Sequence, residues 1–230
     1  MPRFLLAAVL ALTGVAAFAQ TKVHWYGQAA FRIETPSGGV ILIDPWLKVP
    51  TNPDKASIEK LGRVDYILIT HGHWDHLGGV ADLAEGTGAP VHMAEVERDL
   101  LERPDDFTPP GVHVRACTPD VLLQGDEVLE LAGITFETVS VPGHSPGHLA
   151  FAADGALFSG DVLFAGSVGR TDFPGSSWET LLASIRSLLE RFDPETVVYP
   201  GHGPATTLAR ELATNPFLSE LRAALERSEP

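Results

Sequence analysis

The chain has 230 residues, of which 44% are hydrophobic and 20% are charged, and its formal net charge is −14. This composition excludes a wholly disordered chain, and the length is sufficient for one domain with a substantial core. The negative charge, without a cluster of Lys or Arg, argues against nucleic acid and anionic lipid as partners. The single cysteine, Cys117, excludes an intramolecular disulfide and a zinc site built on several thiolates.

The N-terminus has the pattern of a secretory signal peptide. Arg3 is followed by an unbroken apolar stretch at 4–12 and then by small residues that end in Ala17-Phe18-Ala19. A basic start, a short apolar stretch and this cleavage pattern are typical of such signals. The alternatives are an uncleaved anchor and a buried helix, but the stretch is too short to span a bilayer comfortably. We therefore expect residues 1–19 to be removed, leaving a periplasmic or secreted chain of residues 20–230 without a stable membrane anchor.

The mature chain begins with predicted strands. Residues 22–33 are rich in aromatic and β-branched side chains, a turn follows, and residues 40–43 are continuously apolar. This pattern predicts a hairpin with one strand buried on both sides. Residues 66–70 predict another buried strand, which ends at a histidine-rich loop. The next predicted elements are a helix at 80–85, a strand at Val91, a charged helix at 95–103 and a proline-rich loop.

The second half continues with hairpins and closes with helices. Its predicted strands lie at 127–131, 134–141, 149–152, 156–159 and 197–199, and a glycine-rich segment spans 166–175. Ser176 and Glu179 have capping-box spacing, and apolar residues recur at helical spacing from Leu181 to Phe192, which predicts a helix. Two further helical segments end the chain. Two packed sheets with helices outside satisfy this mixed order, and without a linker or repeat we expect a single domain over 20–230.

Potential metal ligands follow four of the predicted strands. They are His71, His73, Asp75 and His76 after the strand at 66–70, and His144, Asp161 and His202 after three later strands. Imidazole and carboxylate groups suit zinc, iron or manganese. A solvated polar loop is the alternative for the first four, and each of the other three, taken alone, is typical of a turn or loop residue.

These seven residues together can supply the ligands for a pair of metal ions. Two tetrahedral ions require eight bonds. One ion is assigned His71, His73 and His144. The other ion is assigned Asp75, His76 and His202. Asp161 then donates one oxygen to each ion, and a water that bridges the ions becomes the nucleophile.

The order His71-Gly-His73-Trp-Asp75-His76, His144, Asp161 and His202 resembles the metallo-β-lactamase superfamily. The resemblance implies an αββα sandwich of the α/β class, with two mixed β-sheets flanked by helices and the metals at one edge of the sheets. Segments 142–148, 158–175 and 199–207 are similar to small bacterial glyoxalase-II-like hydrolases. Segments 25–35 and 41–46 instead look like a lactonase-like branch of uncharacterised metal-dependent hydrolases.

The resemblance implies an exported dinuclear hydrolase that acts on a small activated acyl substrate. We expect a thioester of the hydroxyacylglutathione hydrolase (glyoxalase II) type before a lactone, and not a β-lactam. The ions are expected to be zinc, with iron or manganese as alternatives, and Asp75 is the candidate for proton transfer. The other functions considered are a mononuclear iron persulfide dioxygenase and a non-catalytic metal-binding protein. The oligomeric state stays open.

Two further residues are weaker candidates. Asp44, at the end of the second strand, is a candidate partner for the free ring nitrogen of a ligand histidine, or else a turn carboxylate. Arg170 lies where glyoxalase-like relatives place a cation for the substrate's carboxylate, or else it is a structural arginine paired with Asp172. His148 is expected beside the ligands rather than among them.

Overall fold

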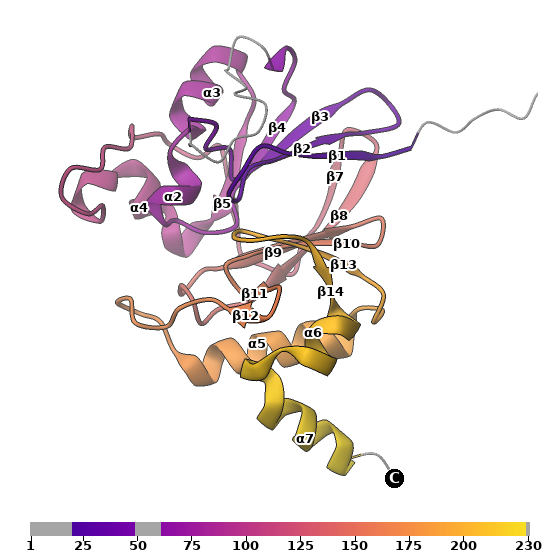
Figure 1. Ribbon diagram of the computed structural model, residues 1–230. Helices are drawn as coiled ribbons and strands as arrows, with labels where there is room; N and C mark the ends of the chain where they lie inside the picture. Colours follow the sequence, from indigo (N-terminus) through magenta and orange to yellow (C-terminus); the bar gives the residue numbers. More distant parts are fainter. Residues whose placement is uncertain (1–19, 49–60, 229–230) are drawn as a thin grey trace, which may run out of the picture.

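The computed structural model describes residues 20–48 and 61–228 as two six-stranded β-sheets that pack against each other, with helices on both outer sides (Figure 1). Both sheets mix parallel and antiparallel pairs. The predicted sandwich of two mixed sheets flanked by helices is confirmed. The signal peptide predicted for residues 1–19 lies outside the described residues.

The first sheet contains, in spatial order, β1 (Lys22–Trp25), β2 (Phe31–Glu34), β3 (Val40–Ile43), β4 (Tyr66–Leu68), β5 (Val91–Ala94) and β6 (Val121–Leu123). The second contains β14 (Thr206–Thr207), β13 (Val197–Pro200), β10 (Ala156–Gly160), β9 (Leu149–Ala153), β8 (Ile134–Ser140) and β7 (Val128–Leu131). A small separate hairpin is formed by β11 (Leu163–Phe164) and β12 (Ser167–Val168).

The helices flank the two sheets. Those on the side of the first sheet are α2 (Trp74–Leu77), α3 (Val80–Thr87), η1 (Glu95–Glu97), α4 (Arg98–Glu102) and η2 (Pro104–Asp106). Those on the side of the second are α5 (Trp178–Arg191), α6 (Leu208–Thr214), η3 (Pro216–Leu218) and α7 (Ser219–Ser228). Within the described ranges, every helix is too short or too polar to cross a lipid bilayer.

Strand β3 contributes to two of the hydrophobic clusters that form the core. All four of its residues are buried. Ile41 and Ile43 belong to the cluster between the sheets, whereas Val40 and Leu42 belong to the cluster under the helices of the first sheet. Successive side chains of a strand point to opposite faces, so a continuously apolar strand fits only where both faces are covered. The predicted two-sided burial of this strand is confirmed.

The single strand predicted at 22–33 is wrong, because a turn divides it into β1 and β2. Gly27 and Gln28 have φ values of 94° and 46°, in the left-handed region that a strand cannot include. The indole nitrogen of Trp25 donates a hydrogen bond of 2.7 Å to the Gln28 carbonyl and closes this turn. The two strands then pair with each other in antiparallel register.

The helix start predicted from the capping-box spacing of Ser176 and Glu179 is one residue too early. The N-cap of α5 is Ser177, whose hydroxyl accepts a hydrogen bond of 3.2 Å from the Thr180 backbone nitrogen. The hydroxyl of Ser176 instead donates to the His144 carbonyl at 3.0 Å. The predicted charged helix at 95–103 is likewise two elements, η1 and α4.

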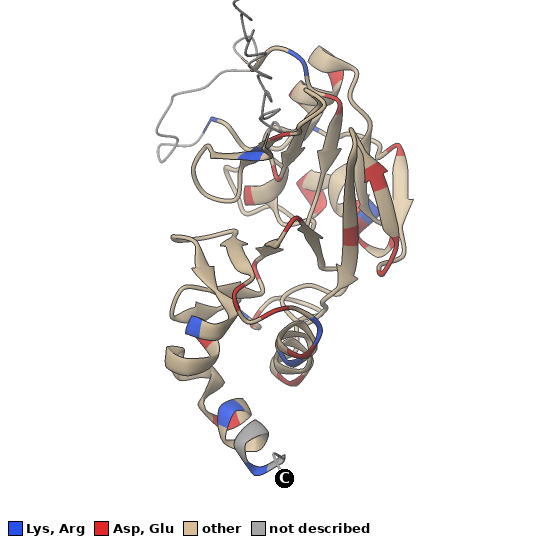
Figure 2. Ribbon diagram, turned by 90° about the vertical axis from the view of Figure 1, so that its right-hand side faces the viewer, with Lys and Arg blue, Asp and Glu red and all other residues tan. Residues whose placement is uncertain are grey.

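Charged residues on the described chain are dispersed. In the view of Figure 2, Asp and Glu lie on strands, helices and loops alike, and Lys and Arg stand apart from one another without forming a basic patch. Several of the basic residues are paired on the surface, as Arg115 is with Asp82 and Glu85.

Candidate metal centre

The predicted ligands lie at one end of the sandwich, where strands of both sheets end. β4 leads into the loop that carries His71 and His73, and β8 leads into the loop that carries His144. Asp161 and His202 follow β10 and β13. One backbone hydrogen bond joins the two sheets here, from the Leu149 nitrogen at the start of β9 to the Thr70 carbonyl after β4 at 2.8 Å. Another joins neighbouring strand ends of the second sheet, from the Gly201 nitrogen to the Gly160 carbonyl at 2.9 Å.

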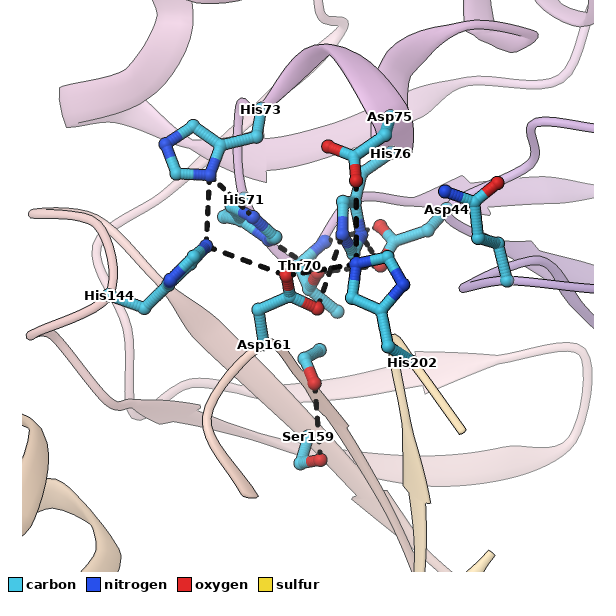
Figure 3. A network of polar contacts seen from close by, with 12 residues as sticks. Asp44, Thr70, His71, His73, Asp75, His76, His144, Ser159, Asp161 and His202 are labelled. Carbon is cyan, nitrogen blue, oxygen red and sulfur yellow. Dashed lines mark hydrogen bonds and ion pairs between the residues drawn. The ribbon is translucent and has the colours of Figure 1, made fainter. Parts of the chain in front are cut away.

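The structure brings all seven predicted ligands together (Figure 3). Their donor atoms form three overlapping groups in which every atom lies within 4.8 Å of the others. Two of the groups coincide with the two sets assigned from the sequence: His71, His73 and His144, and Asp75, His76 and His202. The third, made of His71, His76 and Asp161, lies between them.

In the first group, three ring nitrogens converge. His73 Nδ1 lies 3.1 Å from His71 Nε2 and 2.9 Å from His144 Nε2. The other ring nitrogen of His144 donates a hydrogen bond to the Arg170 carbonyl, and that of His71 lies 3.1 Å from the Thr70 hydroxyl. These contacts hold a proton on Nδ1 of His144 and of His71, and they leave the Nε2 lone pairs of these two rings directed into the site.

Burial keeps the first group neutral. It lowers the pKa of His71 well below its usual value, and neighbouring histidines lower it further. Burial, followed by the charge of His144, lowers the pKa of His73 to about 4. Burial also lowers the pKa of His144. The converging nitrogens of three neutral imidazoles present lone pairs to one another and lack the protons needed for hydrogen bonds between them. Such a set of donors is suited to bind a metal ion.

The second group has a different charge state without metal. His202 Nε2 lies 3.4 Å from Asp75 Oδ2 and 3.2 Å from Asp161 Oδ2. Hydrogen bonds to these two carboxylates raise the pKa of His202 to about 9. Burial acts to lower the pKa of His76, but the charges of Asp161 and Asp44 outweigh it and raise that pKa well above its usual value. In the metal-free protein, protons therefore occupy the places where cations would bind.

Asp161 lies between the two groups, as Figure 3 shows. Its Oδ1 is 3.3 Å from His76 Nε2, and its Oδ2 is 3.6 Å from His144 Nε2 as well as close to His202. Burial acts to raise the pKa of this carboxyl, but His76 and His202 hold it well below the usual range. A buried carboxylate that contacts histidines of both groups is placed where it could ligate a cation in each.

The donor set fits two divalent ions. Buried His76 Nε2 and Asp161 Oδ1 lie 3.3 Å apart, and among the described residues neither makes a hydrogen bond of good geometry. A buried polar atom without a good hydrogen bond costs free energy, which coordination to a cation would offset. Nitrogen and carboxylate oxygen ligands without thiolate match zinc, iron and manganese rather than calcium or magnesium.

Asp44 makes the contact that the sequence suggested for it. Its Oδ2 accepts a hydrogen bond of 2.8 Å from His76 Nδ1, and it also accepts from the Thr70 hydroxyl at 2.6 Å and from the Thr70 backbone nitrogen at 2.8 Å. The residue is buried with φ of 45°, so the backbone adopts an uncommon conformation to place this carboxylate. Asp44 thus orients His76 directly and His71 through Thr70.

His148 lies beside the ligands. Its Nε2 accepts a hydrogen bond of 3.0 Å from the Asp161 backbone nitrogen, and its ring stacks on His71 with centroids 4.5 Å apart. Burial lowers its pKa well below the usual value, so the ring is neutral and able to accept. Gly160 leaves room for this ring, because a Cβ there would lie 2.6 Å from His148 Cε1.

The side chain of Arg170 is exposed on the surface rather than directed at the ligand cluster. It forms two hydrogen bonds to Asp172, at 2.8 and 2.6 Å, and its guanidinium lies 4.6 Å from the centre of the Phe173 ring. The pairing weighed as the structural alternative is therefore present. Sequence reasoning missed the function of the Arg170 carbonyl and of the Thr70 hydroxyl, because backbone and hydroxyl groups that orient ligands carry no sequence signal of their own.

Comparisons with known proteins agree with this geometry. A family model described as the metallo-β-lactamase superfamily matches residues 25–202. The chain is 39% identical over 162 residues to hydroxyacylglutathione hydrolase GloC of Haemophilus influenzae, covering 66% of this chain and 75% of that relative. The structure is similar to the BLEG-1 B3 metallo-β-lactamase, with a TM-score of 0.75 and 32% identity over 86% of this chain and 99% of that one. It is also similar to TTHA1623 in a di-iron-bound form, with a TM-score of 0.61 and 40% identity over 82% and 94% of the two chains.

Proposed function

The chain belongs to the metallo-β-lactamase superfamily of metal-dependent hydrolases, and we propose that it hydrolyses thioesters with the help of two divalent metal ions. The observation that carries this proposal is the position of Asp161 between the two groups of three ligands, with Oδ1 facing His76 and Oδ2 lying between His144 and His202. His71, His73 and His144 would hold one ion. Asp75, His76 and His202 would hold the other.

Two such ions lower the pKa of a bound water and stabilise the oxyanion that develops on the substrate. The chain supplies the orientation. Asp44, Thr70 and the Arg170 carbonyl fix the ring nitrogens of three ligand histidines. Asp75, half-buried beside His202, is the group that would accept and return a proton at its carboxylate.

A thioester is favoured over other acyl compounds for two reasons. Thiolate is a good leaving group that needs little protonation, which suits a site whose candidate acid is the carboxyl group of Asp75. The negative charge of Asp161 between the ions weakens their attraction for a substrate carboxylate and matters less for a neutral carbonyl. The 39% identity to a hydroxyacylglutathione hydrolase supports the same class.

The metals are proposed to be zinc, with iron or manganese as alternatives. The nitrogen and oxygen donor set suits all three. TTHA1623, a protein 40% identical to this chain, is known in a di-iron-bound form, which supports iron as the first alternative.

Export is proposed from the sequence of residues 1–19 alone. An exported enzyme would meet few glutathione thioesters, because these are made in the cytosol. The substrate in the periplasm is therefore proposed to be a thioester of a different thiol, or else a lactone. S-lactoylglutathione serves as a test compound with the same thioester chemistry.

One observation favours a second function. The structure is similar over nearly the full length of the BLEG-1 B3 metallo-β-lactamase, at 32% identity. Hydrolysis of β-lactams is therefore the competing proposal for the same two-ion site.

The test is a comparison of kcat/KM for S-lactoylglutathione, a long-chain homoserine lactone and a penicillin with one metal-loaded preparation. We expect the thioester to be the best substrate. A penicillin turned over above about 10⁴ M⁻¹s⁻¹, the lower end of typical enzymes, with the thioester untouched would replace the proposal by the β-lactamase function. Oxygen uptake with a glutathione persulfide, and no hydrolysis, would replace it by the dioxygenase function.

A further inference from the structure

Glu97, the last residue of η1, is a buried carboxylate outside the ligand set. Its side chain is 1% exposed. One carboxylate oxygen, Oε1, accepts a hydrogen bond of 2.8 Å from the Gly147 backbone nitrogen, and the other, Oε2, accepts from the Gly72 backbone nitrogen. One side chain thus joins two loops that lie 75 residues apart in sequence.

Both loops approach this segment so closely that a side chain would not fit. A Cβ on Gly147 would lie 2.2 Å from Val96 Cγ2 and 2.8 Å from Glu97 Cγ. A Cβ on Gly72 would lie 2.6 Å from Leu100 Cδ1. The two glycines therefore allow the loop backbones to reach the carboxylate, and the segment 96–100 fills the space between them.

The charge of Glu97 is not balanced by a basic side chain. Within the part of the chain that the structure describes, no Lys or Arg pairs with it. Burial raises its pKa, whereas the Ser145 side chain and the two backbone N–H groups oppose that rise. A buried carboxylate without a cationic partner is costly compared with an apolar side chain of similar size, so stability alone does not account for it.

The two loops held by Glu97 supply the whole first ligand group. Gly72 stands between His71 and His73, and Gly147 belongs to the turn that begins at His144. We propose that Glu97 is a positioning residue that sets the spacing of these three histidines and thereby the affinity of the first ion. The proposal rests on the two-ion site proposed above. We expect the second group to be affected less, because His202 is on neither loop and Asp75 and His76 are held in helix α2, where Asp44 also orients His76.

The test measures metal affinity rather than activity. Glu97→Gln keeps the size of the side chain but turns one accepting oxygen into an NH₂ group that faces a backbone N–H. We expect one of the two ions to bind about 10- to 100-fold more weakly, the usual cost of losing a group that orients ligands. Chelator competition, with ions per chain counted by elemental analysis, gives this number, and circular dichroism shows that the variant is folded.

Glu211→Gln is the matched control. Glu211 is also fully buried and accepts backbone and side-chain hydrogen bonds, from the Gly166 nitrogen at 2.7 Å and from the Thr206 hydroxyl at 2.6 Å. Its hydrogen bonds reach neither of the two loops that carry the first ligand group. It is expected to lower the melting temperature of the metal-free protein while the first ion keeps its affinity.

Combined variants identify which ion depends on Glu97. In a His144→Ala background the first group is already broken, so adding Glu97→Gln should weaken metal binding no further. In a His202→Ala background the first group is intact, and Glu97→Gln should weaken the remaining ion by the full 10- to 100-fold.

Three results would overturn the proposal. Unchanged affinities in Glu97→Gln would show that the carboxylate does not position the ligands. Equal losses in both backgrounds, or the same loss in Glu211→Gln, would show a general effect on folding. A wild-type protein that binds fewer than two ions would remove the proposed function and this inference together, whereas the first two results leave the proposed function intact.

Discussion

Asp161 connects the two halves of the proposed site through a single carboxylate. It is buried, and its charge is held by the histidines of both groups. Without it, two cations would face each other with no anion between them. In a buried site that repulsion disfavours the binding of both ions.

We therefore expect Asp161→Ala to bind fewer than two ions per chain and to lose at least about 10²-fold in hydrolysis rate, the scale of removing one key stabilising group. Elemental analysis and a thioester assay measure the two effects. Asp172→Ala is the control, because Asp172 is exposed and its salt bridge to Arg170 lies on the surface. An Asp161→Ala protein that still holds two ions would disprove the bridging role.

The charge of His202 predicts how the metal-free protein responds to pH. Its pKa is raised from 6.5 to about 9 by Asp161 and Asp75, so its pairing stabilises the fold fully below pH 6.5 and is lost as the pH rises through 9. About a third of the side chain is exposed, and solvent reduces the size of the effect. The melting temperature of metal-free protein, relative to His202→Gln, should fall between pH 6.5 and 9. A difference that stays constant over this range would contradict the prediction.

At the residue level, the ligands were predictable and their partners largely were not. His71, His73, Asp75 and His76 stand out because several metal-binding side chains fall within one short loop after a strand. The contact of Asp44 with His76 could be considered from its place at a strand end. Glu97 could not be found in this way, because its function depends on two glycines that only the folded chain brings beside it.

At the level of elements, long and strongly patterned segments were predicted well. Strand β3 is continuously apolar, and helix α5 has apolar residues at helical spacing. Few other secondary structures are compatible with either pattern. The four-residue helix α2 and the two-residue strand β14 carry no such pattern, since their geometry depends on the neighbouring strands and loops. The turn between β1 and β2 was signalled only by Gly27 within an otherwise strand-like segment.

Helix α5 offers a direct test of its observed start. Ser177→Ala removes the N-cap hydrogen bond to the Thr180 nitrogen and should lower the free energy of unfolding by about 1 kcal/mol. Ser187→Ala, an exposed change in the same helix, should leave stability unchanged or raise it slightly, because alanine is the better helix former. Denaturant unfolding of both variants measures this. If Ser177→Ala is as stable as the wild type, the cap contributes nothing.

At the level of the whole molecule, the order of strands and helices predicted the two-sheet sandwich before any contact was known. The apolar strands required cover on both faces, and helices in both halves of the chain supplied it. The order of strands within each sheet was not predictable, because β10 pairs with β13 across α5 and β3 with β4 across an intervening segment. Such long-range pairings leave no local pattern.

Export is a property of the full-length chain and is tested in cells. When the protein is produced in a Gram-negative host, N-terminal sequencing should give Gln20 as the first residue of protein from the periplasm, since Ala17-Phe18-Ala19 is the expected cleavage site. Intact Met1 on soluble cytoplasmic protein would contradict the prediction.

Hydrolysis that depends on two ions in each chain is tested most directly by a metal titration. Divalent metal is added in steps to the metal-free protein, and ions bound per chain and the rate of S-lactoylglutathione hydrolysis are measured on the same samples. The rate should stay low up to one ion per chain and rise by about 10²-fold as the second ion binds, because both ions are needed at the reacting water and the developing oxyanion. A full rate with one ion per chain, or two bound ions without hydrolysis of any acyl compound, would contradict the proposed function.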